Sequence, residues 1–173
     1  MKDKLRKEYL SRRKRVSNKM IKDNSIFNKL INDCDVLVSD NILIYVSFSD
    51  EIDTRNIISY FFSVGKKVYV PRVVGKNMEF YRIWSFKDLK TGYRNILEPV
   101  GREKIINFDK TVCIVPGICF NKSFYRIGYG GGFYDRFLSE NKMISIGLCY
   151  KECLIDEEFN EEWDVSVSKV MTD

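Results

Sequence analysis

A glycine-rich stretch constrains this chain more than any other part of it. Residues 115–138 read VPGICFNKSFYRIGYGGGFYDRFL and place four of the ten glycines within the five positions 128–132. An apolar run, residues 111–115, precedes them, and a short helical pattern follows. Strand, glycine loop and helix is a layout in which backbone N–H groups converge on an anion at the helix N-terminus. Glycine suits such a loop because a side chain would block positive φ angles and the close approach of a ligand.

Charged residues flank the glycines and suggest what the loop binds. Arg126 would offer a planar guanidinium to phosphate oxygens. Asp135 falls in the first turn of the next helix, where it either complements the helix dipole or joins phosphates in binding Mg²⁺. Asp164 is the better second carboxylate, because it precedes a predicted strand. We interpret the loop as a phosphate site; the alternative is a tight strand-to-helix turn without a ligand.

The loop departs from three standard nucleotide-binding motifs. Gly132 is followed by Phe133-Tyr134, whereas a Walker A loop requires Lys followed by Ser or Thr. Phe133 also stands where the dinucleotide fingerprint needs its last glycine, and the partner motifs of a protein kinase are absent downstream. Aromatic residues alternate with the glycines at Tyr129, Phe133 and Tyr134. They suit either a flat heterocycle or the hydrophobic core.

The rest of the chain alternates between strand and helix patterns. A buried strand over 42–46, a helix capped by Asp53 or Thr54, and a strand over 67–70 that stops at Pro71 form a predicted βαβ unit. Further strands are predicted at 78–83, 143–148 and 165–170, and further helices at 2–21 and 26–32. We therefore predict a single α/β domain, residues 1–173, with a mixed sheet. Glu51 follows the first strand, at the edge where α/β ligands bind, although an ordinary loop carboxylate is the alternative.

Composition excludes several classes of protein. The 173 residues contain no histidine, which excludes Ser-His and Cys-His nucleophiles and argues against structural zinc. The five cysteines are odd in number and lack a C-x-x-C pair, so we expect reduced core thiols and a cytoplasmic location. The apolar runs are too short to cross a bilayer. Neither a membrane nor a metal-thiolate role is expected.

Positive charge is concentrated at the N-terminus. Residues 1–22 carry ten Lys or Arg against two acidic residues, so this segment is +8 while the net charge of the chain is +5. Leu5, Tyr9, Val16 and Met20 form an apolar stripe that predicts a docked helix. The basic face is a solvated surface, a nucleic-acid arm, or a source of cations for a phosphate site. The helix pattern alone does not choose among these.

The long glycine-containing stretch resembles the signature of the 5-formyltetrahydrofolate cyclo-ligases, also called 5,10-methenyltetrahydrofolate synthetases. Shorter segments are similar to other motifs of that family and follow in the same order. They are KDKLR at 2–6, SDEIDT at 49–54, Pro71-Arg72, Glu98-Pro99, Trp163-Asp164 and VMT at 170–172. The resemblance thus covers nearly the whole chain. It favours phosphate-directed cations on the N-terminal helix over a nucleic-acid arm or a sugar-phosphate-binding protein.

The resemblance implies a three-layer α/β/α, Rossmann-like fold and an ATP- and Mg²⁺-dependent activity on 5-formyltetrahydrofolate, in a monomer. The implied ATP contacts are Lys2, Arg6, Arg126, Ile127, Gly128, Tyr129, Gly130, Gly131, Gly132, Phe133 and Tyr134. The implied folate contacts are Val46, Glu51, Tyr129, Gly130, Gly131, Gly132 and Phe133. Asp135 and Asp164 would hold Mg²⁺. Lys2, Arg6 and Arg126 would carry the catalytic charge.

The implied chemistry suits a chain without histidine. The formyl oxygen attacks the γ-phosphate, N10 closes the ring, and phosphate leaves. Nucleophile and amine both belong to the folate, so the protein positions them and stabilises charge. Three positions depart from the family pattern: Asn121 replaces the usual Asp, Phe124 the usual Gly, and Ser168 a common acid. Polyglutamate preference and the contacts of Arg72, Tyr150 and Lys151 stay open.

Overall fold

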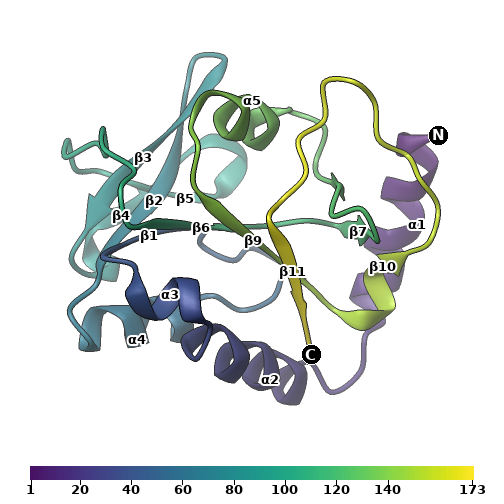
Figure 1. The fold of residues 1–173 in the computed structure, drawn as a ribbon, viewed down its shortest axis with the longest axis horizontal. Helices are drawn as coiled ribbons and strands as arrows, with labels where there is room; N and C mark the ends of the chain where they lie inside the picture. Colours follow the sequence, from purple (N-terminus) through teal and green to yellow (C-terminus); the bar gives the residue numbers. More distant parts are fainter.

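The computed structural model describes residues 1–173, and a six-stranded sheet lies at its centre (Figure 1). The strand order is β11-β9-β6-β1-β2-β3, and every neighbouring pair is parallel except β2 and β3. The strands are β1 (Asn41–Ile44), β2 (Lys67–Val74), β3 (Asn77–Ile83), β6 (Thr111–Val115), β9 (Ile144–Cys149) and β11 (Lys169–Thr172). The predicted mixed sheet is confirmed.

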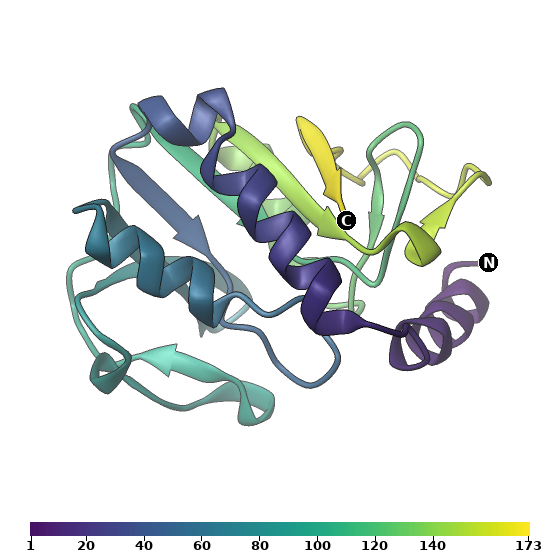
Figure 2. The same ribbon diagram turned by 90° about the horizontal axis from the view of Figure 1, so that it is seen from below.

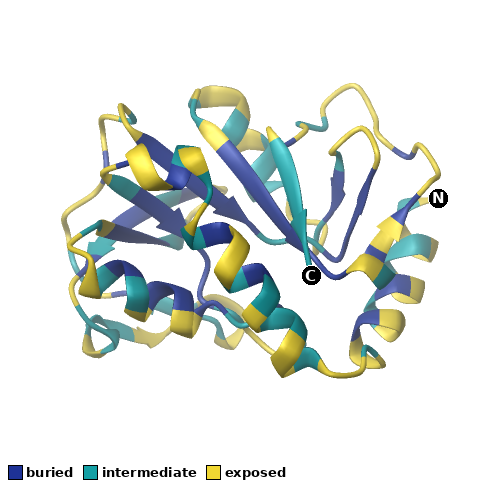
Figure 3. Ribbon diagram, turned by 60° about the horizontal axis from the view of Figure 1, so that its bottom comes forward, coloured by how far each residue is buried: buried dark blue, intermediate teal, exposed yellow.

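Helices cover both faces of this sheet. Three of them, α2 (Lys19–Ile31), α3 (Cys34–Val38) and α4 (Arg55–Ser63), lie on one face, and α5 (Phe133–Glu140) lies on the other (Figures 1 and 2). Because it is covered on both sides, β6 is buried along its whole length. Figure 3 shows this burial along the central strands, and 37 buried residues form one hydrophobic cluster. The architecture is the predicted three-layer α/β/α arrangement.

A smaller sheet and the first helix stand beside the main sheet. The small sheet has the order β10-β7-β8, with β7 (Cys119–Asn121), β8 (Arg126–Ile127) and β10 (Leu154–Ile155). Helix α1 (Lys2–Lys14) packs on β8 and on the 3₁₀ helix η3 (Lys151–Cys153) (Figure 2). The remaining elements are β4 (Leu89–Thr91), β5 (Leu97–Pro99), η1 (Phe86–Asp88) and η2 (Tyr93–Asn95).

One ring joins the small sheet to the main one. Phe120 of β7 is fully buried between Gly117, after β6, and Gly147 of β9. A Cβ atom would lie 2.3 Å from this ring at Gly117 and 2.4 Å from it at Gly147. Both positions therefore need glycine for the ring to fit.

The N-terminal helix prediction is wrong in its extent. The chain leaves the helix after Lys14, Asn18 adopts φ 54°, and α2 begins at Lys19 rather than at residue 26. Asparagine is one of the few non-glycine residues that adopt this left-handed conformation readily. Tyr9 is buried as expected, but Met20 is 83% exposed and lies outside the docked face. The helix α3, capped by Asp33, was not predicted.

Two strand boundaries also differ from the prediction. Strand β2 continues through Pro71 to Val74, because β1 pairs with it only over residues 67–69 and leaves a free edge at the proline. The last strand begins at Lys169 rather than at residue 165. Val165 and Val167 instead donate their N–H groups to Asp135 Oδ1 and the Phe124 carbonyl.

The cysteines fit the expected core thiols, with one exception. All five cysteines are free, and every one except Cys34 is buried. None of the helices combines the length and the apolarity that a bilayer-spanning segment requires.

Candidate active site

A cavity of about 940 Å³ opens where the strand order reverses. From β1 the chain crosses through α4 to β2 on one side, while β6 pairs with the other side of β1. In open α/β sheets, ligands bind at the carboxyl ends of the strands at such a switch point. Tyr45 and Val46, after β1, and Pro116 and Gly117, after β6, line the cavity there. The topology thus places the cavity where this fold binds its ligands.

The cavity gathers all the residues that the sequence predicted for the site. They come from α1, the loop after β1, the glycine loop, α5 and the segment before β11. They are Lys2, Arg6, Val46, Glu51, Arg126, Ile127, Gly128, Tyr129, Gly130, Gly131, Gly132, Phe133, Tyr134, Asp135 and Asp164. Residues far apart in the sequence therefore share one cavity. Their individual roles stay predictions.

The glycine loop connects β8 to α5 and leaves the helix N-terminus open. Gly132 is the N-cap of α5 with φ 65°, and Gly130 has φ 91°. No side chain caps this helix, so its first N–H groups are free to bind an anion. Arg6 Nε donates to the Gly128 carbonyl over 2.8 Å, which attaches α1 to the loop. A helix follows the loop as predicted, but the strand next to the loop is the short β8, because the unpredicted β7–β8 hairpin separates the apolar run at 111–115 from the glycines.

The two charged residues that flank the glycines pair with each other. Arg126 Nη1 lies 3.1 Å from Asp135 Oδ1, and Nη2 lies 3.0 Å from Oδ2. Arg126 is 8% exposed, and its Nη1 also donates to the Val165 carbonyl. The guanidinium carbon is 5.5 Å from the centre of the Tyr134 ring. A predicted phosphate contact and a predicted metal ligand thus neutralise each other here.

A second ion pair repeats this arrangement at the other metal candidate. Lys2 Nζ lies 2.5 Å from Asp164 Oδ2 and 2.6 Å from Glu161 Oε2. The same Asp164 oxygen accepts the Glu161 N–H over 2.7 Å, while Asp164 Oδ1 accepts no hydrogen bond from the protein. Five basic and six acidic side chains line the cavity, so its charges nearly balance.

Glu51 provides an acceptor at the sheet end of the cavity. Its Oε2 accepts the Phe48 N–H over 2.9 Å, and the carboxylate is half-buried. Burial raises the pKa of Glu51, while the Phe48 N–H, the Arg13 charge and the Tyr129 hydroxyl act in the opposite direction. Val46 next to it is buried. An acceptor set in an apolar wall suits the N–H edge of a planar heterocycle.

The structure adds residues that the sequence interpretation missed. Arg13 of α1 is buried and donates over 2.7 Å to the Tyr129 hydroxyl. The sequence feature that could have indicated its burial is its spacing, four residues after the buried Tyr9. Tyr93 and Arg94 reach the cavity from the β4–β5 hairpin, and the Tyr93 ring lies 6.3 Å from the Phe133 ring. No sequence pattern indicated that hairpin.

The basic residues of α1 do not form one exposed surface. In the cluster at residues 12–15, Arg13 is buried and Arg12 pairs with Glu8. Lys2 and Arg6 face the cavity. Of the four cations that the nucleic-acid alternative needs, only Arg13 is buried; Arg12, Lys14 and Arg15 are exposed.

The residues left open by the sequence have structural contacts. Arg72 Nη1 donates to the carbonyls of Pro99 and Gly101, 3.1 Å from each. The Tyr150 hydroxyl donates to Asp23 Oδ1 over 2.6 Å, and the Lys151 N–H donates to Asp173. These contacts join segments of the fold.

The three departures from the family pattern are also accommodated. Asn121 is buried and donates to Glu158 Oε2 over 2.8 Å, and Ser168 accepts the Ser145 N–H over 3.0 Å. Phe124 has φ 65°, the left-handed conformation that a glycine would adopt without strain. Of the three, only Phe124 holds an unfavourable backbone conformation.

Fold and cavity together define an α/β protein with an open ligand site, which cationic side chains, the N-terminus of α5 and an acceptor carboxylate line together. The chain belongs to the 5-formyltetrahydrofolate cyclo-ligase family, whose model matches residues 1–173. The resemblance seen in the sequence is therefore confirmed, and the chain is an enzyme of the ligase class.

Individual relatives agree with this assignment. The chain is 31% identical over 132 residues to the "Probable 5-formyltetrahydrofolate cyclo-ligase" of Schizosaccharomyces pombe, covering 66% of this chain and 65% of that protein. It is 28% identical over 145 residues to the 5-formyltetrahydrofolate cyclo-ligase of Escherichia coli K12, covering 79% and 80%. The solved structure of Aquifex aeolicus 5,10-methenyltetrahydrofolate synthetase matches with a TM-score of 0.85 at 26% identity, covering 98% of this chain and 88% of that one.

Proposed function

We propose that this enzyme converts 5-formyltetrahydrofolate to 5,10-methenyltetrahydrofolate, with ATP consumed and ADP and phosphate released. One observation carries the proposal: a single cavity of about 940 Å³ joins an uncapped helix N-terminus to the half-buried acceptor Glu51. Its volume lies toward the upper end of the range of about 300–1,000 Å³ for ligand pockets. That space allows a nucleotide and a folate to be held side by side.

The nucleotide would lie at the glycine end. Free N–H groups at the start of α5 would bind phosphate oxygens, and Lys2, Arg6 and Arg126 would supply cations from two sides of the cavity. Glycine at 130 and 132 allows the backbone to turn toward the phosphates, because both residues have positive φ.

Mg²⁺ fits the residues present. The cavity carries about as much negative as positive charge, so a polyphosphate needs further positive charge to bind there. Asp135 and Asp164 line the cavity and offer the hard carboxylate oxygens that Mg²⁺ prefers, and Asp164 Oδ1 is free of protein hydrogen bonds. When bound, Mg²⁺ would reduce the negative charge on the transferring phosphoryl group.

The folate would lie at the sheet end, where Glu51 would accept N–H groups of the pterin and Val46 and Tyr129 would contact its ring. Since the formyl oxygen and N10 react within the substrate, these side chains only need to orient it. Lys2, Arg6 and Arg126 would stabilise negative charge on the transferred phosphoryl group.

The test is an absorbance assay for the methenyl-folate product. We expect the product band to grow only when ATP, Mg²⁺ and 5-formyltetrahydrofolate are all present, with one ADP formed for each product molecule. Folded enzyme that forms no product with all three present contradicts the proposal. Product formed without ATP hydrolysis contradicts its ATP-dependent part.

A further inference from the structure

Arg13 is a buried cation. It lies behind the part of the cavity wall that Tyr129 forms. Its side chain comes from α1, and the residue is 4% exposed. Nη2 donates to the Tyr129 hydroxyl over 2.7 Å, and Nη1 donates to the Gly117 carbonyl over 3.2 Å. Nε is buried and has no hydrogen-bond partner. A buried, incompletely paired guanidinium destabilises a fold, which indicates that the residue serves the site.

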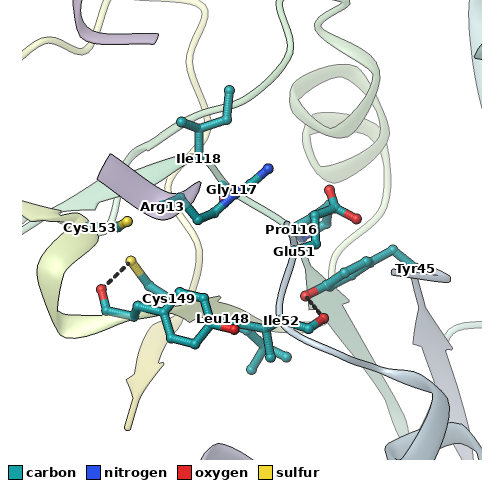
Figure 4. A pocket seen from close by; sticks show the side chains of 11 residues that line it. Arg13, Tyr45, Glu51, Ile52, Pro116, Gly117, Ile118, Leu148, Cys149 and Cys153 are labelled. Carbon is teal, nitrogen blue, oxygen red and sulfur yellow. Dashed lines mark hydrogen bonds between the residues drawn. The ribbon is translucent and has the colours of Figure 1, made fainter. Parts of the chain in front are cut away.

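The charge of Arg13 acts on Glu51. Arg13 and Glu51 line the same small void of about 10 Å³, which they reach from α1 and from the loop after β1 (Figure 4). Arg13 is the one cation among the groups that influence the pKa of Glu51. No direct hydrogen bond joins the two side chains, so the charge of Arg13 acts on Glu51 through space.

The other titratable groups that face the Glu51 charge are tyrosines, and the buried Cys149 and Cys153 thiols line the same void. Tyr45 at the end of β1, Tyr129 in the glycine loop and Tyr134 in α5 all face its charge. Burial raises the pKa of each of these hydroxyls, so none carries charge near neutral pH. The neighbouring Asp50 pairs with Lys19. Arg13 is therefore the cation that stabilises the Glu51 carboxylate, together with the Phe48 N–H and the Tyr129 hydroxyl.

We propose that Arg13 is a positioning residue of the folate site, which fixes the Tyr129 hydroxyl and the Gly117 backbone and places its positive charge at the void that Glu51 also lines. Naming the ligand as a folate rests on the proposed function, whereas the effect of Arg13 on Glu51 does not. The role differs from that of Lys2 and Arg6, which lie on the same helix but at the phosphate end of the cavity.

The test compares Arg13→Met and Arg13→Lys with Lys14→Met as the matched control. Methionine keeps the apolar stem without charge, and lysine keeps the charge without the two-pronged donor. Lys14 is exposed on the same helix and has no side-chain partner. We expect Arg13→Met to raise the KM for 5-formyltetrahydrofolate about tenfold or more while the KM for ATP changes less than about twofold. The control should match the wild type in both.

The pH dependence separates positioning from plain stabilisation. Without the Arg13 charge the Glu51 pKa rises further, so the acidic limb of kcat/KM for the folate moves to higher pH in Arg13→Met. In Arg13→Lys, the acidic limb of kcat/KM should lie closer to that of the wild type. The KM for the folate should stay partly raised. A drop in melting temperature with both KM values and the pH limb unchanged would overturn the proposal.

A direct titration keeps the inference independent of turnover. The NMR signal of the Glu51 carboxyl carbon can be assigned in ¹³C-labelled protein, because it disappears in Glu51→Gln. This signal should titrate at higher pH in Arg13→Met than in the wild type. Equal titration curves overturn the inference even if the enzyme is active. If the wild type is inactive, the proposed function fails while this titration still decides the role of Arg13. If Arg13→Met does not fold, Arg13→Lys and Tyr129→Phe replace it in the test. Tyr129→Phe should then raise the KM for the folate but not the KM for ATP. A Tyr129→Phe variant without this increase contradicts the proposal.

Discussion

Arg126 and Asp135 face each other across the glycine loop, with their paired nitrogen and oxygen atoms 3.1 and 3.0 Å apart. Lys2 and Asp164 make the same kind of pair on the other side of the cavity. In both pairs a proposed phosphate contact holds a proposed metal ligand. Binding of a magnesium nucleotide would then exchange two protein ion pairs for contacts to the ligand. The protein keeps these charges ordered before the ligand arrives, which lowers the reorganisation needed for catalysis.

Asp135→Asn tests this pairing. The variant keeps an acceptor for the Val165 N–H but leaves the buried Arg126 without a counter-charge. We expect turnover to fall about 100-fold or more and the free energy of unfolding to fall by about 1–3 kcal/mol. Asp156→Asn is the matched control, because Asp156 pairs with Lys122 at an exposed site. Denaturant titration and initial rates measure both effects; a loss of stability with normal turnover would leave Asp135 a structural residue only.

Gly132→Ala should damage both the fold and the site. The residue has φ 65°, and an added Cβ atom would lie 2.7 Å from Arg136 Nη1. We expect about 1–2 kcal/mol of lost stability from the backbone strain, with a raised KM for ATP. Gly65→Ala is the control, since Gly65 has φ 77° and open space around it at the end of α4. Gly65→Ala should lose a similar amount of stability while its KM for ATP stays unchanged. If the two variants have equal KM values for ATP, the glycine loop does not bind the nucleotide.

Glu51→Gln is expected to stabilise the protein while weakening folate binding. Burial raises the folded-state pKa of Glu51, so the folded state binds its proton more tightly than the unfolded state does. Between the unfolded and the folded pKa, stability conferred by this group therefore decreases as pH rises, and the loss persists at neutral pH. Glutamine removes this loss, so we expect the melting temperature of the variant at pH 7 to be higher than that of the wild type.

The comparison at acidic pH is the control for that prediction. Below the unfolded pKa both states carry a protonated Glu51, so the variant and the wild type should have nearly the same melting temperature there. Folate titration at pH 7 should show weaker binding by Glu51→Gln. A variant that is less stable than the wild type at pH 7 would contradict the assigned direction of the pKa shift.

Lys2→Met should act on the nucleotide rather than on the fold. Its Nζ pairs with Asp164 and Glu161 at a partly exposed site, where an ion pair contributes about 1 kcal/mol or less. We expect the KM for ATP to rise about tenfold, and the KM for the folate to stay within about twofold. Lys4→Met on the exposed face of α1 is the matched control. If both variants raise the KM for ATP equally, general charge rather than the position of Lys2 is responsible.

Local patterns predicted most of the fold, whereas most of the predicted site residues came from the resemblance to the cyclo-ligase family. The apolar run at 111–115 and the four glycines at 128–132 have strong local preferences, and both behave as expected. The helix break at Asn18 and the proline inside β2 were missed because their cause lies elsewhere: a docking surface for α1 and the short pairing of β1 with β2. Tertiary context overrode local propensity at these positions.

The sequence could not predict which side chains form hydrogen bonds or ion pairs with each other. Arg12 and Arg13 look equivalent in a basic run, yet one is exposed and the other is 4% exposed beside Tyr129. The pairing of Arg126 with Asp135 also depends on how β8 and α5 meet across the loop. Such contacts are decided by packing of distant segments, which residue type and spacing do not encode.

Phe120 does not line the cavity, yet it packs between the main sheet and the small sheet beside it. Its ring sets the spacing between β9 and the small sheet, and that sheet in turn supports α1 with Lys2 and Arg6. A smaller side chain at position 120 would let the small sheet and α1 move toward β9, and Lys2 and Arg6 would move with them. Divergence in substrate range within such an enzyme could therefore begin in the hydrophobic interior, with every ligand-contacting residue unchanged.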